Sequence, residues 1–248
     1  MTSSGPNAVT AARPTSADTA EPSGAVRRDR WVNVQLALLS AAAGATDAVA
    51  YLGLGGVFTA NMTGNLVLFG IGGAYGADLH LARAVVAVVA YVLGLVVTYS
   101  MTPDPGPEAS PWPRRVGSAL AVSLLTQTAL MVVWAACSAR PGRGIELVLV
   151  GLSAAAMGIQ TAVARRLSLA GITTTFITGT LTSMVESLCQ GSAKYVLRRG
   201  TALLALVLGA LIAALLLEAA PVLAAAVAPA LVLITLVVAQ LRLRRPQC

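Results

Sequence analysis

The chain has 248 residues, of which 56% are hydrophobic and 11% charged, and its mean hydropathy is +0.78. A soluble domain carries about 25% charged residues, so this composition excludes an ordinary soluble globular protein. The net charge of +7 does not indicate nucleic-acid binding, because the arginines lie at the ends of apolar runs, where basic residues set membrane orientation. We expect an all-α, polytopic transmembrane protein with the lipid bilayer as its partner.

The first segment, residues 1–30, is predicted to be a disordered N-terminal tail. Its first 26 residues are rich in Ser, Thr, Ala, Pro and Gly, and they hold too little large apolar surface to fold. A signal peptide would place a basic region directly before an apolar core, which this segment does not do. Trp31, after a cluster of arginines, marks the predicted entry into the membrane interface.

Apolar runs long enough to cross a bilayer follow the tail, since a spanning helix takes roughly 20 residues. The six strong ones are Val32–Leu54, Ala82–Met101, Val116–Cys137, Ile145–Ala164, Thr201–Leu217 and Val222–Gln240. Two weaker segments, Val57–Tyr75 and Ile172–Cys189, are rich in Gly, Thr or Asn. We expect these two to be helices that either span the membrane or enter and leave it on one side.

A pattern in the first weak segment recurs in the second, 115 positions later. Thr63-Gly64 matches Thr178-Gly179, and 12 of the 39 positions from 56 to 94 are identical without a gap. Composition alone gives about four such matches, so we interpret the pattern as an internal duplication. The first membrane repeat is then residues 31–138 and the second residues 144–241, within one membrane domain.

The distribution of Lys and Arg leaves two topologies open. Six spans place thirteen of the flanking basic residues inside and three outside, whereas eight spans place twelve inside and four outside. Both put the N- and C-termini in the cytoplasm. Six spans make the two halves oppositely oriented and eight make them parallel, and both arrangements occur in transporters. Glycines such as Gly70 weaken the motif helices and favour six spans.

Two carboxylates within apolar segments are candidates for function. Asp47 lies inside the first span, where an acidic side chain costs roughly 2.5–3.5 kcal/mol on insertion scales and usually marks a path or a relay. The alternative is a wet or capping position near Gly55-Gly56. Glu186 lies in the second motif segment, where Lys194 or Arg198 from the following loop could instead neutralise it.

The two Thr-Gly motifs offer hydroxyl, amide and backbone groups that a broken helix can direct at an ion or a polar solute. The alternative is helix packing, in which small residues let helices approach closely. The predicted substrate-binding residues are Asp47, Asn61, Thr63, Gly64, Asn65, Gln160, Thr174, Thr175, Thr178, Gly179, Thr180 and Glu186.

Motifs for enzymatic chemistry are missing from the sequence. It has no Gly-rich loop followed by Lys-Ser or Lys-Thr and no His-Glu-x-x-His motif. Its one histidine, His80, falls in a predicted loop. Cys137, Cys189 and Cys248 show no metal or redox spacing. We expect no enzymatic activity, no metal and no cofactor.

Four stretches of the chain resemble the YoaK-type family of bacterial integral membrane proteins, a domain of unknown function. They are Gly44–Ala48, Val57–Leu66, Gly158–Val163 and Thr174–Leu181. The resemblance covers roughly residues 31–240. It implies a multi-helix protein of the bacterial inner membrane and supplies no substrate.

The expected function is a transporter or channel for a small solute or an ion, with a polar site between the two repeats. A non-transporting membrane scaffold or regulatory protein is the alternative, in which the repeated motifs are packing seams. The residues do not indicate an oligomeric state.

Overall fold

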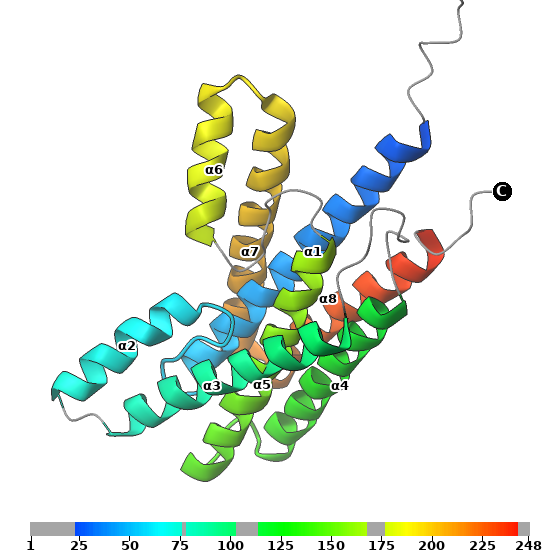
Figure 1. Ribbon diagram of the computed structural model, residues 1–248. Coiled ribbons are helices and arrows are strands. Elements are labelled where there is room, and N and C mark those ends of the chain that lie inside the picture. Colours follow the sequence, from blue (N-terminus) through cyan, green and yellow to red (C-terminus); the bar gives the residue numbers. More distant parts are fainter. Residues whose placement is uncertain (1–22, 76–77, 103–113, 168–176, 243–248) are drawn as a thin grey trace, which may run out of the picture.

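The computed structural model describes residues 23–75, 78–102, 114–167 and 177–242, and within these ranges the chain is all helix and connecting turns. Figure 1 labels the elements in chain order. The helices are α1 (Ser23–Gly53), α2 (Met62–Tyr75), α3 (Asp78–Met101), α4 (Arg114–Ala136), α5 (Arg143–Leu167), α6 (Ile177–Cys189), α7 (Ala193–Ala219) and α8 (Pro221–Arg242). The expected all-α class is confirmed.

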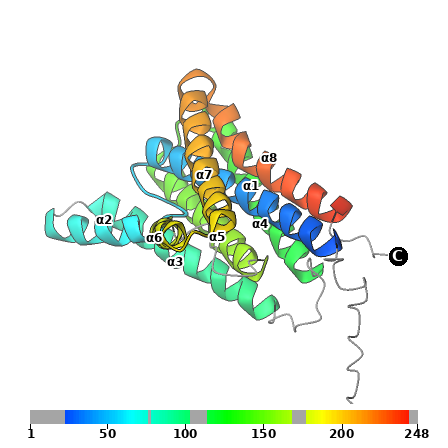
Figure 2. The same ribbon diagram turned by 90° about the horizontal axis from the view of Figure 1, so that it is seen from above.

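Among the described helices, six are long and apolar enough to cross a membrane: α1, α3, α4, α5, α7 and α8. The motif helices α2 and α6 have 14 and 13 residues. At 1.5 Å per residue they are about 20 Å long, whereas the hydrocarbon core is about 30 Å thick. The lengths therefore favour six spans. In agreement with an even number of spans, α1 begins and α8 ends at the same end of the bundle (Figures 1 and 2).

Three helix boundaries differ from the predicted ones. α1 begins at Ser23, so residues 23–30 of the predicted disordered tail are helical. The first motif segment is irregular until α2 begins at Met62, because Gly55 and Gly56 adopt left-handed φ angles of 83° and 79° that end α1. α7 begins at Ala193, so Lys194 and Arg198 lie on a helix and not in a loop.

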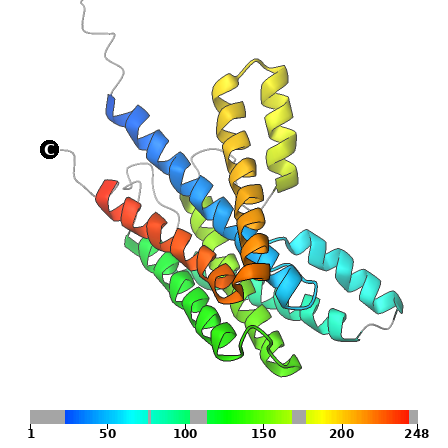
Figure 3. The ribbon, with the colours of Figure 1, turned by 180° about the vertical axis from the view of Figure 1, so that it is seen from behind.

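The two predicted halves interleave in the bundle. α1 packs against α7 and α5 packs against α3, while α1 contacts α8 and α5 contacts α4. The motif helices sit on the helices that follow them, α2 on α3 and α6 on α7, and the two pairs project from the bundle in different directions (Figures 1 and 3). If each helix is replaced by its equivalent in the other half, the contact of α1 with α7 becomes that of α5 with α3, and the contact of α1 with α8 becomes that of α5 with α4. A duplicated chain would show this correspondence. The duplication itself stays a prediction from the sequence.

Glycines set the crossing of α1 and α7. A Cβ on Gly209 would overlap the carbonyl oxygen of Ala41 and lie 2.7 Å from its carbonyl carbon, and one on Gly44 would lie 2.9 Å from the carbonyl carbon of Leu206. Side chains at these positions would hold the two backbones apart. The crossing of α3 and α5 is built in the same way, since Gly158 faces the backbone of Tyr91.

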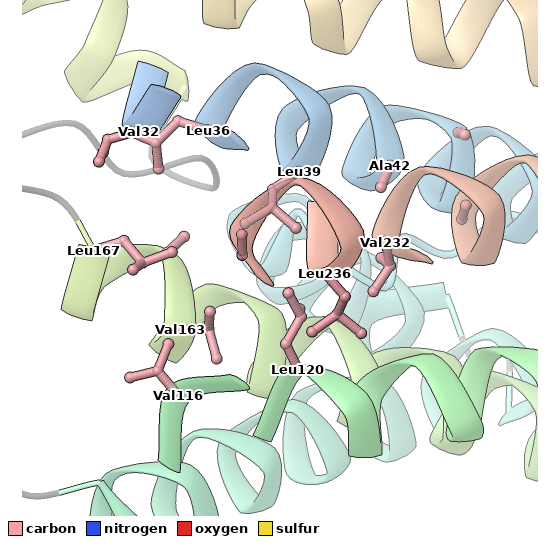
Figure 4. Packing of buried hydrophobic residues seen from close by; sticks show 14 of the residues in the cluster. Val32, Leu36, Leu39, Ala42, Val116, Leu120, Val163, Leu167, Val232 and Leu236 are labelled. Carbon is pink, nitrogen blue, oxygen red and sulfur yellow. The ribbon is translucent and has the colours of Figure 1, made fainter. Parts of the chain in front are cut away.

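The larger apolar core joins α1, α4, α5 and α8 with one residue of α7, Ala213, and Figure 4 shows part of it. Leu39, Leu120, Val163 and Val232 are fully buried there, one from each of the first four helices. A second cluster lies further along the bundle around Trp134, whose indole Nε1 donates a hydrogen bond of 3.0 Å to the carbonyl of Pro221. The two clusters hold α1, α4, α5 and α8 together, and α3 and α7 pack against α5 and α1.

Candidate functional site

A cavity of about 970 Å³ lies beside the α1–α7 crossing, and both repeated motifs reach it. Its polar wall comes from four helices and one loop: Asp47, Asn61, Thr63, Tyr91 and Thr178. Its apolar wall is larger and includes Tyr51, Leu52, Phe58, Leu206, Val207 and Leu211. Thr63 and Thr178 are equivalent positions of the sequence repeat. The structure therefore brings the two motifs to one cavity.

The Asp47 carboxylate is held by the loop that leads into α2. One oxygen, Oδ1, accepts hydrogen bonds of 2.7 Å from the backbone N–H groups of Thr59 and Ala60. The other, Oδ2, accepts a bond of 3.1 Å from the N–H of Asn61. Since α2 begins at Met62, the carboxylate lies at the positive end of that helix. Three N–H donors are the partners that a carboxylate inside a membrane protein requires.

This geometry combines the two readings of Asp47 that the sequence left open. The side chain does cap backbone groups, but those of the α2 entry and not those of Gly55-Gly56. It also lines the cavity. Its residue type is therefore required both for the shape of the loop and for the polarity of the wall.

Asn65 braces the same loop from within α2. Its Oδ1 accepts a hydrogen bond of 2.9 Å from the N–H of Phe58, and its Nδ2 donates to the carbonyl of Phe58. The Phe58 ring then stacks on Tyr51 with 5.0 Å between centroids, and Gly64 leaves room for it, since a Cβ there would lie 2.8 Å from the ring. Asn65 and Gly64 thus shape the cavity wall without lining it.

The loop is also tied to the second half. Ser153 of α5 donates a hydrogen bond of 2.9 Å to the hydroxyl of Thr59, and both side chains are fully buried. The backbone of Thr59 is one of the donors to Asp47. Two hydrogen bonds that meet at Thr59 therefore connect α1, the loop and α5.

The second motif contributes less than the sequence predicted. Thr178 lines the cavity, Thr180 is buried and Gly179 is exposed. Glu186 does not reach the cavity, because it lies two turns further along α6, is exposed and accepts a hydrogen bond of 3.4 Å from Gln190. The predicted residues Thr174 and Thr175 lie outside the described residues.

Gln160, another predicted binding residue, has a packing role. It is 2% exposed, and its Nε2 donates a hydrogen bond of 2.9 Å to the carbonyl of Leu39. The bond links α5 to α1 within the bundle, away from the cavity wall. A polar side chain in an apolar helix predicted a site here, but it serves a helix–helix contact.

A buried ion pair between α3 and α5 was not predicted. The guanidinium of Arg83 lies 2.6 Å from the carboxylate of Glu146, and both side chains are about nine-tenths buried, at 9% and 11% exposure. Arg83 also donates a bond of 3.4 Å to the carbonyl of Gly55. The sequence signal is an arginine near the start of one span and a glutamate near the start of another, and nothing within either segment points to the other.

Tyr91 is also absent from the predicted site residues. It lies on α3, lines the cavity and donates a hydrogen bond of 3.1 Å to the hydroxyl of Thr161 on α5. Gly158, which faces the backbone of Tyr91, lets α3 approach α5 closely enough for this bond. A phenol at the cavity wall adds an aromatic face and a polar group.

The groups on the cavity wall can bind a ligand through hydrogen bonds, charge and apolar contact. Across the described residues, no group of three His, Cys, Asp or Glu side chains is placed to hold a metal ion. The polar wall offers one carboxylate, one amide and three hydroxyl groups, set in apolar surroundings. Such a mixture is typical of a site for a small molecule.

Six apolar helices with a polar-lined cavity between them define a polytopic helical membrane protein. Residues 35–239 match the family model described as "Protein of unknown function (DUF1275)", and the chain belongs to this family. It is 35% identical over 156 residues to the UPF0700 transmembrane protein YoaK of Bacillus subtilis (strain 168), which covers 63% of this chain and 67% of that protein. No solved structure matches the chain. The YoaK-type resemblance of the sequence is thereby confirmed.

Proposed function

We propose that this protein is a transporter or channel of the bacterial inner membrane, without enzymatic activity, and that the cavity beside the α1–α7 crossing is its solute site. The observation that carries the proposal is the meeting of Thr63 and Thr178, equivalent positions of the two repeats, with Asp47 in one cavity. Sites of transporters built from repeats lie where the repeats meet and use broken helices.

The proposed solute is a small organic molecule rather than a bare inorganic ion. A volume of about 970 Å³ is at the upper end of the range of small-molecule sites, roughly 300–1,000 Å³. The aromatic rings of Tyr51, Phe58 and Tyr91 supply apolar contact area, and the Asp47 carboxylate favours a solute with a hydrogen-bond donor or a positive charge.

The alternative is a non-transporting scaffold or regulatory protein. The contacts of Asp47 with Thr59, Ala60 and Asn61 favour it to the extent that they give this side chain a role in folding. Under the alternative, the cavity is filled by lipid and its hydroxyl groups are not needed for any flux.

Flux in liposomes separates the two. Purified protein is reconstituted, small organic cations and neutral amphipathic solutes are screened for uptake with and without a proton gradient, and each hit is repeated with Thr63→Val and Thr178→Val. These isosteric changes remove cavity hydroxyl groups, each worth about 0.5–1.5 kcal/mol, so uptake at low solute concentration falls roughly two- to tenfold. Thr126→Val is the control, because Thr126 is half-buried on α4, does not line the cavity and bonds its own helix.

Two results would count against transport. One is the absence of flux for every solute in the panel with correctly folded protein. The other is flux that Thr126→Val lowers as much as the cavity variants do, because the cavity would then not be the path.

We also propose the six-span orientation with cytoplasmic termini. Single cysteines at Tyr75 and Arg140, in a background without the native cysteines, then react with a membrane-impermeant thiol reagent from outside intact cells, while one at Arg114 does not. Eight spans predict the reverse for all three positions.

A further inference from the structure

We propose that a second groove, on the other side of the α1–α7 crossing, binds one anionic phospholipid. Arg30 and Lys194 hold its phosphate, and its acyl chain lies in the apolar length of the groove. This site is distinct from the solute cavity and does not depend on the transport proposal.

The groove has a volume of about 670 Å³ and lies among α1, α7 and α8. It extends to the crossing, where Gly209 meets the backbone of Ala41. We name it the basic groove, and it is lined by Arg30, Asn33, Val34, Ala37, Leu38, Ala41, Lys194, Leu197, Arg198, Thr201, Ala205, Leu208, Gly209, Ile212, Val227 and Leu231.

Positive charge collects at the end of the basic groove that lies away from the crossing. Arg30 is the first residue of the spanning part of α1, and Lys194 is the second residue of α7. Both side chains belong to exposed residues, and Arg198 lies one turn further along α7. None of the described residues that line the groove is acidic. The N-terminal turn of α7 adds the positive end of a helix dipole, so this end attracts an anion.

The rest of the groove is apolar and open to the surroundings. Leu197 is 74% exposed, and Val34, Leu208 and Ile212 are also exposed. In a spanning protein such surfaces face lipid chains. A free phosphate or a soluble acidic peptide would use the charged end and leave this surface uncovered, whereas a phospholipid matches both parts.

The length of the groove fits one leaflet. Arg30 and Ala41 are separated by eleven residue steps along α1, which is about 16 Å at 1.5 Å per residue. This is about half of the hydrocarbon thickness of about 30 Å. A chain that starts with its phosphate at Arg30 therefore ends near the crossing. Basic pockets between transmembrane helices are known to bind anionic headgroups.

The test uses native mass spectrometry of the full-length protein in detergent. Phosphatidylglycerol and phosphatidylcholine with identical acyl chains are titrated separately, and the bound fraction of each is measured. We expect phosphatidylglycerol to bind more tightly. In the double variant Arg30→Gln/Lys194→Gln its affinity falls about thirtyfold, from about fivefold for each basic side chain, and phosphatidylcholine binding does not change.

Three controls make the result specific. Arg140→Gln/Arg143→Gln removes the same charge from two exposed arginines, one in the α4–α5 turn and one at the start of α5, and leaves phosphatidylglycerol affinity within about twofold of the wild type. Arg30→Lys retains the charge and most of the affinity. Glycerol phosphate, a headgroup without chains, does not displace the lipid at equal concentration.

The proposal is overturned if the two lipids bind equally, or if the two double variants lose affinity equally. Displacement of phosphatidylglycerol by equimolar glycerol phosphate also overturns it, because the site would then be one for a soluble anion.

Discussion

Gly209→Ala tests whether the close approach of α1 and α7 holds the bundle together. The added Cβ would lie 2.7 Å from the carbonyl carbon of Ala41 and 2.8 Å from its Cα. Non-bonded carbons prefer about 3.5–4.0 Å, so the helices have to separate by about 1 Å. Both obstacles are backbone atoms and cannot rotate away. Overpacking of this kind costs about 1–3 kcal/mol.

The matched control is Gly70→Ala. Gly70 lies within α2, and no atom stands within 4 Å of where its Cβ would be. Alanine is the better helix former there by about 0.5–1 kcal/mol, so this variant gains stability. The same chemical change therefore has opposite signs at the two positions.

The assay is thermal unfolding of the detergent-solubilised protein. For a chain of this size 1 kcal/mol shifts the Tm by about 2–4 °C, so Gly209→Ala lowers it by roughly 2–12 °C. Gly70→Ala raises it by roughly 1–4 °C on the same scale. A Tm of Gly209→Ala equal to or above that of the wild type would refute the close crossing of α1 and α7.

Other perturbations address the loop and the ion pair. Asp47→Asn puts an amide where the N–H of Asn61 needs an acceptor, so hydrogen exchange over residues 59–65 accelerates about ten- to a hundredfold, and unchanged exchange contradicts the capping role. Asn65→Ala removes the two bonds to Phe58 and lowers the unfolding free energy by about 1–3 kcal/mol in denaturant titration. Glu146→Gln lowers the unfolding free energy by about 3–5 kcal/mol because it leaves Arg83 buried without its counter-ion. The double variant Arg83→Met/Glu146→Leu lowers it by less than the sum of the losses caused by Arg83→Met alone and Glu146→Leu alone. Additive costs would show that the pair is not coupled.

The spans were predictable because hydropathy depends only on local composition. Each of the six long helices overlaps one strong apolar run, and only their ends differ. The start of α7 was misplaced because Lys194 and Arg198 lower the hydropathy of a segment that is helical all the same. Basic side chains at the end of a spanning helix are compatible with helix and with the membrane interface.

Asp47 was identifiable from the sequence because a carboxylate in a long apolar run costs free energy to insert in the membrane, and such residues usually have a functional role. What the sequence could not give was its set of partners. The donors are backbone N–H groups of Thr59, Ala60 and Asn61, and every residue except proline offers such a group. Only the path of the loop decides which of them reach the carboxylate.

The predictions for Gln160 and Glu186 show where residue type misleads. A glutamine in an apolar helix is equally suited to a solute and to a carbonyl of the next helix, and Leu39 provides that carbonyl. Glu186 lies two turns beyond Thr178 on α6 and is exposed, so it does not line the cavity. The pairing of Arg83 with Glu146 joins residues on different helices, and a pattern search within one segment cannot find it.

The glycine contact lets α1 and α7 touch at a single crossing point. Because both helices are stiff, a change in their crossing angle separates them on both sides of that point. A lipid chain that separates them in the basic groove would therefore also widen the solute cavity, so the composition of one leaflet would set the width of the cavity.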